Sequence, residues 1–238
     1  IPNCAEILEK YSGQLKDPNV GGLNVRLINY LDSQEGGGSA SEHRYTRIFR
    51  NDRRIRFKGR VHEQIRDSIE DVGYGIVDTD IEIHHYGYAE PSKAKMQRNK
   101  ELLERESAEN PDDDWLKMHS GETEFALGNL EGAEKIFSAI ADSQQLSDLQ
   151  RHKTKIRLGQ IALSKEKLDK VEQWLNFTSD DTDMEGLRKY VLAAGKSLRQ
   201  EFEEALRLYN SKEVGESKLV DKNMLRQAVE SISKYVNK

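Results

Sequence analysis

The chain has 238 residues and a formal net charge of −5, and charged residues make up 33% of it, above the roughly 25% of an average globular protein. An acidic chain offers no general basic field to nucleic acid or to an anionic membrane, and no apolar run approaches the ~20 residues of a membrane-spanning helix. Cys4 is the single cysteine, which excludes an internal disulfide and, together with the lack of a signal peptide, indicates a cytoplasmic protein.

Residues 1–91 are expected to form a small α/β segment. In chain order the sequence pattern predicts a helix at 5–15, a strand at 23–31, a hairpin of strands 44–50 and 54–60, a helix at 63–70 and a strand at 81–86. The hairpin prediction depends on the alternation of Ile55 and Phe57 with arginines and lysine. Strand parity places His84 and His85 on opposite faces, so this dipeptide is unsuited to a two-histidine metal clamp.

Residues 92–238 are expected to be entirely helical, with helices at 92–109 and 221–236 at their two ends. Between them a spacing recurs, in which a small residue is followed 12 and 16 residues later by apolar ones. The three copies are Gly121, Ala133 and Phe137, then Gly159, Val171 and Leu175, then Ala193, Ala205 and Tyr209. This spacing resembles tetratricopeptide repeats over residues 111–215. The expected fold class is therefore mainly α, with a tetratricopeptide-like α-α superhelix after the small α/β segment.

The segment from Arg44 to Arg66 is strongly basic, with nine lysines or arginines against the two acids Asp52 and Glu63. The planar guanidinium group suits phosphate or carboxylate recognition, because it donates two parallel hydrogen bonds. A solvated strand face explains the same charges about equally well. RNA binding is a weaker alternative, because no aromatic residues alternate with these arginines.

Glu63 and the histidines allow two interpretations each. A carboxylate at a helix start is commonly there to complement the helix dipole, but the same position suits a general base that deprotonates a hydroxyl group. A histidine such as His85 is more often structural than a metal ligand. We treat His43, His119 and His152 as structural. The sequence contains no zinc-finger spacing, no glycine-rich phosphate loop before a helix and no evident Ser/His/Asp set.

Four short motifs follow one another in order over residues ~44–140. They are Arg47-Ile48-Phe49-Arg50-Asn51, Gly59-Arg60-Val61-His62-Glu63, His85-Tyr86-Gly87-Tyr88 and Arg98-Asn99-x-x-Leu102-Leu103. In this order they resemble the C-terminal half of bacterial family 2 glycosyltransferases of the SunS-like branch, which carry tetratricopeptide-like repeats after the catalytic domain. The resemblance implies that residues 1–91 are the acceptor-side remnant of a GT-A-type catalytic domain and that residues 92–238 are the repeat domain.

The resemblance also implies roles for individual residues. Glu63 would be the catalytic base and His85 a histidine on the metal side, where a divalent cation (Mn²⁺ or Mg²⁺) serves the full-length enzyme. The implied substrate-binding residues are Arg60 and His62 in the cleft and Arg47 and Arg50 near the donor diphosphate.

The donor-binding half of such an enzyme, with its Asp-x-Asp motif, is missing from this sequence. Asp78-Thr79-Asp80 and Asp181-Thr182-Asp183 have the letter pattern, but their order and context favour turn or loop acids. Since the chain begins at Ile1 rather than Met, we expect a C-terminal fragment of a sugar-nucleotide-dependent enzyme that is inactive without its upstream half. The alternative is a non-enzymatic repeat scaffold that binds a protein partner.

Overall fold

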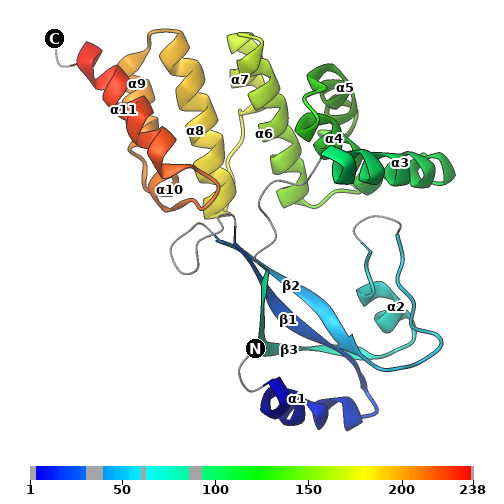
Figure 1. Ribbon diagram of the computed structural model, residues 1–238. Coiled ribbons are helices and arrows are strands. Elements are labelled where there is room, and N and C mark those ends of the chain that lie inside the picture. Colours follow the sequence, from blue (N-terminus) through cyan, green and yellow to red (C-terminus); the bar gives the residue numbers. More distant parts are fainter. Residues whose placement is uncertain (1–3, 31–39, 60–62, 86–92, 237–238) are drawn as a thin grey trace. The chain divides into compact units, whose positions relative to one another are not determined.

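A computed structural model describes residues 4–30, 40–59, 63–85 and 93–236 of the chain. The chain divides into two compact units, Ile1–Lys95 and Met96–Lys238, and each is described by itself. Most of the described residues are helical, and the first unit contains a small three-stranded mixed sheet (Figure 1). The structure therefore confirms a mainly helical chain preceded by a small α/β segment. No helix within the described ranges combines the length and apolar character that crossing a membrane requires.

The sheet has the strand order β2-β1-β3, with β1 (Val20–Tyr30) in the centre. β2 (Ala40–Phe49) pairs antiparallel with β1, and β3 (Gly75–His85) pairs parallel with it (Figure 1). The predicted strand at 23–31 corresponds to β1, and the one at 81–86 is the second half of a longer strand.

The predicted hairpin of strands 44–50 and 54–60 is wrong. The partner of β2 is β1, and the described residues 51–59 form a turn and irregular backbone. The N–H of Arg56 donates to Ser68 Oγ at 2.7 Å instead of to a neighbouring strand. Ile55 is buried against α2, whereas Phe57 is 47% exposed, so the apparent alternation does not reflect one buried strand face.

One face of the sheet packs against α1 (Cys4–Ser12) and the short 3-10 helix η1 (Gln14–Lys16). The buried residues of this core are Tyr11, Val20, Leu23, Val25 and Ile81. At its edge, Asp80 accepts hydrogen bonds from the Tyr11 hydroxyl and from Lys10 Nζ, which lower the pKa of its carboxyl group. The segment Asp78-Thr79-Asp80 lies within β3 (Gly75–His85), so its interpretation as turn or loop acids is wrong.

The other face packs against α2 (Arg66–Asp71) only at one end. There, Ile69 lies so close to β1 that a Cβ atom on Gly22 would come within 2.9 Å of its Cδ1 atom. The predicted helix at 63–70 begins three residues later than expected, because Ile65 is its N-cap. Beyond α2 this sheet face carries the polar side chains of Asn24, Arg26, Glu42 and Glu82.

The second unit consists of helices joined by short connections (Figure 1). The remaining helices of the chain are α3 (Lys93–Glu109), α4 (Asp114–Ala126), α5 (Leu130–Ile140), α6 (Asp148–Ser164), α7 (Leu168–Trp174), α8 (Thr182–Leu198), α9 (Phe202–Tyr209), α10 (Lys212–Glu216) and α11 (Lys222–Val236). The helices predicted at 92–109 and 221–236 correspond closely to α3 and α11. Asp181 is the N-cap of α8, accepting from the N–H of Met184 at 2.8 Å.

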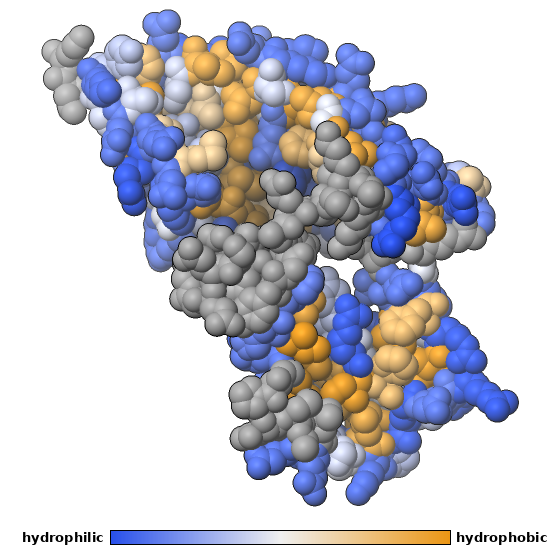
Figure 2. All heavy atoms as spheres, in the orientation of Figure 1, coloured by the Kyte–Doolittle hydropathy of each residue, from blue (hydrophilic) through white to orange (hydrophobic). Residues whose placement is uncertain are grey.

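The small residues of the repeated spacing lie where two consecutive helices pack together. A Cβ atom on Gly121 would lie 2.6 Å from Cε1 of Phe137, and one on Gly159 would lie 2.9 Å from Leu175. Such distances are too short for a side chain, so glycine lets the second helix of each pair approach closely. Figure 2 shows apolar side chains gathered between the helices of this unit and hydrophilic ones on its outer side.

Candidate functional site

A small polar cavity of about 40 Å³ lies beside the sheet of the first unit. Its lining comes from the middle of the sheet, from the segment before α2 and from the start of α2. The lining residues are Asn24, Arg44, Tyr45, Thr46, Arg47, Phe57, Glu63, Gln64, Ile65 and Arg66. The cavity therefore brings together Glu63 and Arg47, two of the residues that the sequence singled out.

A β-bulge places Arg47 at the cavity. Leu23 pairs with Ile48 and Asn24 pairs with Thr46, so Arg47 is an extra residue in β2. A bulge redirects side chains locally, and here Thr46 and Arg47 both line the cavity although they are neighbours in a strand. The guanidinium group of Arg47 lies 5.1 Å from the ring centre of Tyr45 and forms no ion pair with any described residue.

Two backbone hydrogen bonds between Lys58 and Gln64, at 2.8 and 2.9 Å, position the backbone next to Glu63. Gly59 has φ +92°, a conformation that favours glycine. Glu63 stands directly before the pairing of Gln64 with Lys58 and outside α2, so the interpretation as a helix-start acid fails and Asp67 takes that place.

The charges around the cavity are mostly positive. Three arginines, Arg44, Arg47 and Arg66, surround the single carboxylate of Glu63, which is exposed. Arg66 donates to Glu70 at 3.0 Å, and Arg44 donates to the Thr79 carbonyl at 3.2 Å. Arg44 also lies 3.9 Å from Asp78, at the limit of an ion pair. Two of the three guanidinium groups are thus held by neighbours, whereas among the described residues that of Arg47 contacts the ring of Tyr45.

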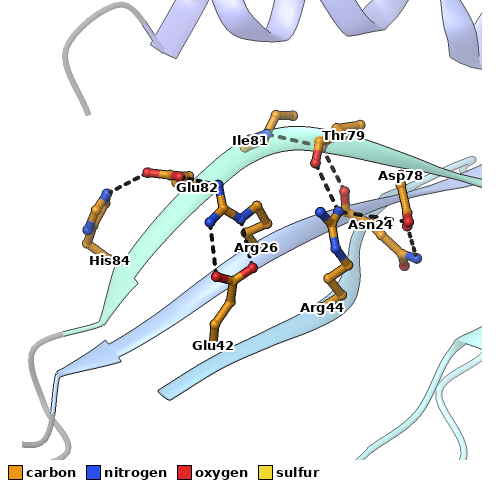
Figure 3. Close-up of polar contacts among 9 residues, drawn as sticks. All are labelled: Asn24, Arg26, Glu42, Arg44, Asp78, Thr79, Ile81, Glu82 and His84. Carbon is orange, nitrogen blue, oxygen red and sulfur yellow. Dashed lines mark hydrogen bonds and ion pairs between the residues drawn. The ribbon is translucent and has the colours of Figure 1, made fainter. Parts of the chain in front are cut away.

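Buried polar groups form the floor of the cavity. Asn24 is 5% exposed and Thr46 is 7% exposed. The Thr46 hydroxyl donates to Asn24 Oδ1 at 2.7 Å. Asn24 Nδ2 in turn donates to Asp78 Oδ1 at 2.7 Å (Figure 3). The hydroxyl of Thr79 donates to the Asn24 carbonyl at 2.7 Å. This chain of hydrogen bonds crosses all three strands and fixes the orientation of the floor.

A second polar cluster continues along the same sheet face. Arg26 donates two hydrogen bonds to Glu42, at 2.8 and 2.9 Å, and one to Glu82 at 2.6 Å (Figure 3). The hydrogen bonds that Arg26 donates to Glu42 and the charges of both carboxylates raise the pKa of Arg26. His84 Nε2 lies 3.4 Å from Glu82. This cluster is internally paired and does not line the cavity.

Arg50 has a structural role in the first unit. Its Nε donates to the Val20 carbonyl at 2.7 Å, and its Nη2 donates to the Asp17 carbonyl. Its guanidinium group also lies 5.4 Å from the ring centre of Tyr74. The side chain thereby ties the end of β2 to the start of β1, and it is not part of the cavity lining.

His85 is not close to Glu63 in the sheet. It pairs with Asn29, five residues beyond Asn24, which corresponds to about 16 Å along the strand. Within the part of the chain that the structure describes, no group of three or more His, Cys, Asp or Glu side chains is arranged to hold a metal ion. Arg60 and His62 lie outside the described residues.

Sequence reasoning missed the floor of the cavity. Asn24 carried a signal, because a polar residue between Leu23 and Val25 in a central strand must face either solvent or a polar site. The sequence around Thr46 does not point to a site, since threonine is common in strands. The bulge that brings Thr46 and Arg47 together depends on the partner strand and is not evident in the local sequence.

Comparison with known proteins adds no relative: no protein-family model matches the chain, and no curated protein matches it significantly.

Proposed function

We propose that the chain is the C-terminal part of a sugar-nucleotide-dependent glycosyltransferase of family 2, in which the first unit forms part of the acceptor side. The observation that carries the proposal is the position of Glu63. Glu63 stands outside any helix, directly before the backbone pairing of Gln64 with Lys58, and lines a polar cavity together with arginines. A helix-dipole role does not explain this position, whereas a general base must be able to reach the proton that it abstracts, and Glu63 is exposed at the cavity.

In the proposed reaction Glu63 accepts the proton of an acceptor hydroxyl group. The acceptor oxygen then forms a bond to the anomeric carbon of the donor sugar. The bond from that carbon to the diphosphate oxygen breaks, and its electron pair leaves with the diphosphate. Negative charge develops on the departing diphosphate, and positively charged side chains placed beside it would stabilise that charge. The sugar nucleotide is assigned to an upstream half of the full-length protein.

A divalent cation, Mn²⁺ or Mg²⁺, belongs to the proposal for the full-length enzyme. The described residues do not form a ligand set for it, because no group of three or more His, Cys, Asp or Glu side chains among them is arranged to hold a metal ion. We therefore assign no step of the reaction to a cation held by this part of the chain.

Residues 92–238 are proposed to be a tetratricopeptide-like superhelix that docks a partner or the acceptor. The pairing of Gly121 with Phe137 and of Gly159 with Leu175 supports this, since the same small-to-large contact recurs in successive helix pairs.

The test is Glu63→Gln in the full-length protein, assayed for transfer from a sugar nucleotide. Loss of a general base is expected to lower kcat by about 10²–10⁴-fold. Glu9→Gln is the matched control, because Glu9 is exposed on α1 against the opposite face of the sheet, and its activity should stay within about twofold. Normal turnover by Glu63→Gln would remove this residue from the mechanism.

A non-enzymatic scaffold is the second candidate. It is favoured by an open groove of about 510 Å³ beside α7 and α8, lined in part by Leu175, Phe177 and Leu192. Recovery of a stable protein partner by the whole chain, combined with no sugar transfer by the full-length protein, would support this alternative.

A further inference from the structure

We propose that the cavity beside Glu63 binds an oxyanion group carried by the acceptor, so that the acceptor is an anionic alcohol rather than a neutral sugar. The statement that the ligand is the acceptor rests on the proposed function. The statement that the ligand is an anion rests on the cavity alone. Three observations support it: the charge of the lining, the hydrogen-bonding capacity of the floor and the size of the cavity.

The charge of the lining favours an anion. Arg44, Arg47 and Arg66 outnumber the single carboxylate of Glu63. Arg47 is the decisive residue, because no ion pair to it exists within the described ranges and its side chain is exposed. A guanidinium group in this state retains its donors for a carboxylate or phosphate, to which it binds with two parallel hydrogen bonds.

The floor offers further bonds to an oxyanion. The amide nitrogen of Asn24 has two hydrogens and donates one of them to Asp78. Its second N–H is therefore left for a ligand. Since Asn24 is 5% exposed, an unused donor there is costly, and a bound oxygen atom would satisfy it.

The size of the cavity limits the ligand. At about 40 Å³ it exceeds the 10–15 Å³ that one water molecule requires, but it is far smaller than the 300–1,000 Å³ of a pocket for a drug-sized ligand. One carboxylate or phosphate group fits this scale, and a sugar nucleotide does not. With Glu63 at the same cavity, the acceptor would present a hydroxyl group beside its anionic group.

The test titrates the whole 238-residue chain with inorganic phosphate, with glycerate and with neutral glycerol, at constant ionic strength. Backbone amide NMR shifts of residues 44–47 and 63–66 report binding at the cavity. Phosphate or glycerate should give saturable shifts there, and glycerol should give none. Tighter binding of phosphate than of glycerate would indicate a phosphate ligand, and tighter binding of glycerate would indicate a carboxylate ligand.

Arg47→Gln should weaken this binding at least tenfold, equivalent to about 1.4 kcal/mol. Arg53→Gln is the matched control, because Arg53 is an exposed arginine in the next turn that does not line the cavity, and its affinity should stay within about twofold. Unchanged amide shifts elsewhere would show that the Arg47→Gln variant is folded. Equal weakening by both substitutions, or shifts that never saturate, would indicate general charge screening and overturn the site.

The two proposals fail in different ways. If the cavity binds no anion while Glu63→Gln abolishes transfer, the anionic-acceptor inference is wrong and the glycosyltransferase proposal stands. If anion binding depends on Arg47 while Glu63→Gln transfers normally, the cavity is an anion site and its assignment to an acceptor is wrong.

Discussion

The two units of the chain use their charged residues differently. In the helical unit, acids and bases on different helices are paired: Glu122 contacts Arg157 at 2.8 Å and Lys153 at 3.0 Å, and Glu134 contacts Lys165 at 2.6 Å. The sheet unit also contains such pairs, for example Arg26 with Glu42 and Glu82, but Arg47 and Glu63 line one cavity without an ion pair to any described residue.

The comparison distinguishes two kinds of charged side chain. Those paired between helices contribute to packing, whereas those unpaired at the cavity are available to a ligand. A charge paired between two helices fixes their spacing and has little capacity for a further ligand. A charge held at a cavity without a partner stabilises the fold less and is available for binding. The following predictions test this comparison with substitutions of three kinds. They change a core residue of the helical unit, a buried ion pair of the same unit and a polar residue beneath the cavity of the sheet unit.

The largest effect is expected from Phe137→Ala in the helical unit. Phe137 is fully buried against Gly121, and its truncation leaves a cavity that should lower the free energy of unfolding by about 3–5 kcal/mol. Urea unfolding followed by tryptophan fluorescence measures this unit selectively, because Trp115 and Trp174 are the only tryptophans and both lie in it. Leu149→Ala is the control, since Leu149 is 46% exposed and should change stability by less than about 0.5 kcal/mol. A similar loss in both variants would contradict the assignment of Phe137 to the core.

The next effect concerns the buried pair of Glu185 and Arg188, whose side chains are 9% and 10% exposed. Arg188 donates to Glu185 at 2.5 and 2.8 Å. Glu185→Gln leaves a buried guanidinium charge without its carboxylate, and the free energy of unfolding should fall by about 3 kcal/mol. Glu203→Gln, at an exposed position in α9, should have almost no effect in the same fluorescence assay.

The same pair predicts a dependence on pH. Burial alone would raise the pKa of Glu185, but hydrogen bonds from Arg188 and from the Ser179 N–H outweigh it, and the pKa in the folded state is lowered. The stabilisation is therefore complete above the unfolded pKa of about 4.3 and is lost as pH falls through the folded value. The stability difference between wild type and Glu185→Gln should shrink as pH falls below about 4. A difference that stays constant down to acid unfolding would contradict this coupling.

A smaller effect is expected from Thr46→Val in the sheet unit. Valine has nearly the same shape but cannot donate to Asn24 Oδ1, which leaves a buried acceptor unsatisfied at a cost of about 1–3 kcal/mol. Hydrogen exchange of the β1 amides measures the sheet directly, and the tryptophan signal of the helical unit should be unchanged. Thr178→Val, at an exposed position, provides the control. Unchanged exchange in β1 would show that the floor is not a stabilising network.

The helices could be predicted from the sequence because their signals are local. Asn110 and Pro111 end α3, and the small residues at Gly121 and Gly159 mark the helix contacts. The ends of α3 and α11 were predicted within one residue. These signals need only the residues within a few turns of each position.

The sheet could be predicted only in part, because pairing joins distant segments. The sequence alternation over residues 54–60 predicts a hairpin, but β1 supplies the partner of β2 from an earlier part of the chain. The placement of Glu63 likewise depends on the closure between Lys58 and Gln64 and on the conformation of Gly59. The separation of His85 from Glu63 follows from the parallel pairing of β3, which the local sequence does not specify.

Because of the bulge in β2, the number of residues in this strand can change by one without a change in how β2 aligns with β1. Arg47 is the additional residue between the pairs of Leu23 with Ile48 and of Asn24 with Thr46, so a strand shortened by this one position retains every other pairing in order. Insertions and deletions normally shift every following side chain to the opposite face. At this position, removal of one residue would alter the lining of the cavity while the remaining ladder stays in register.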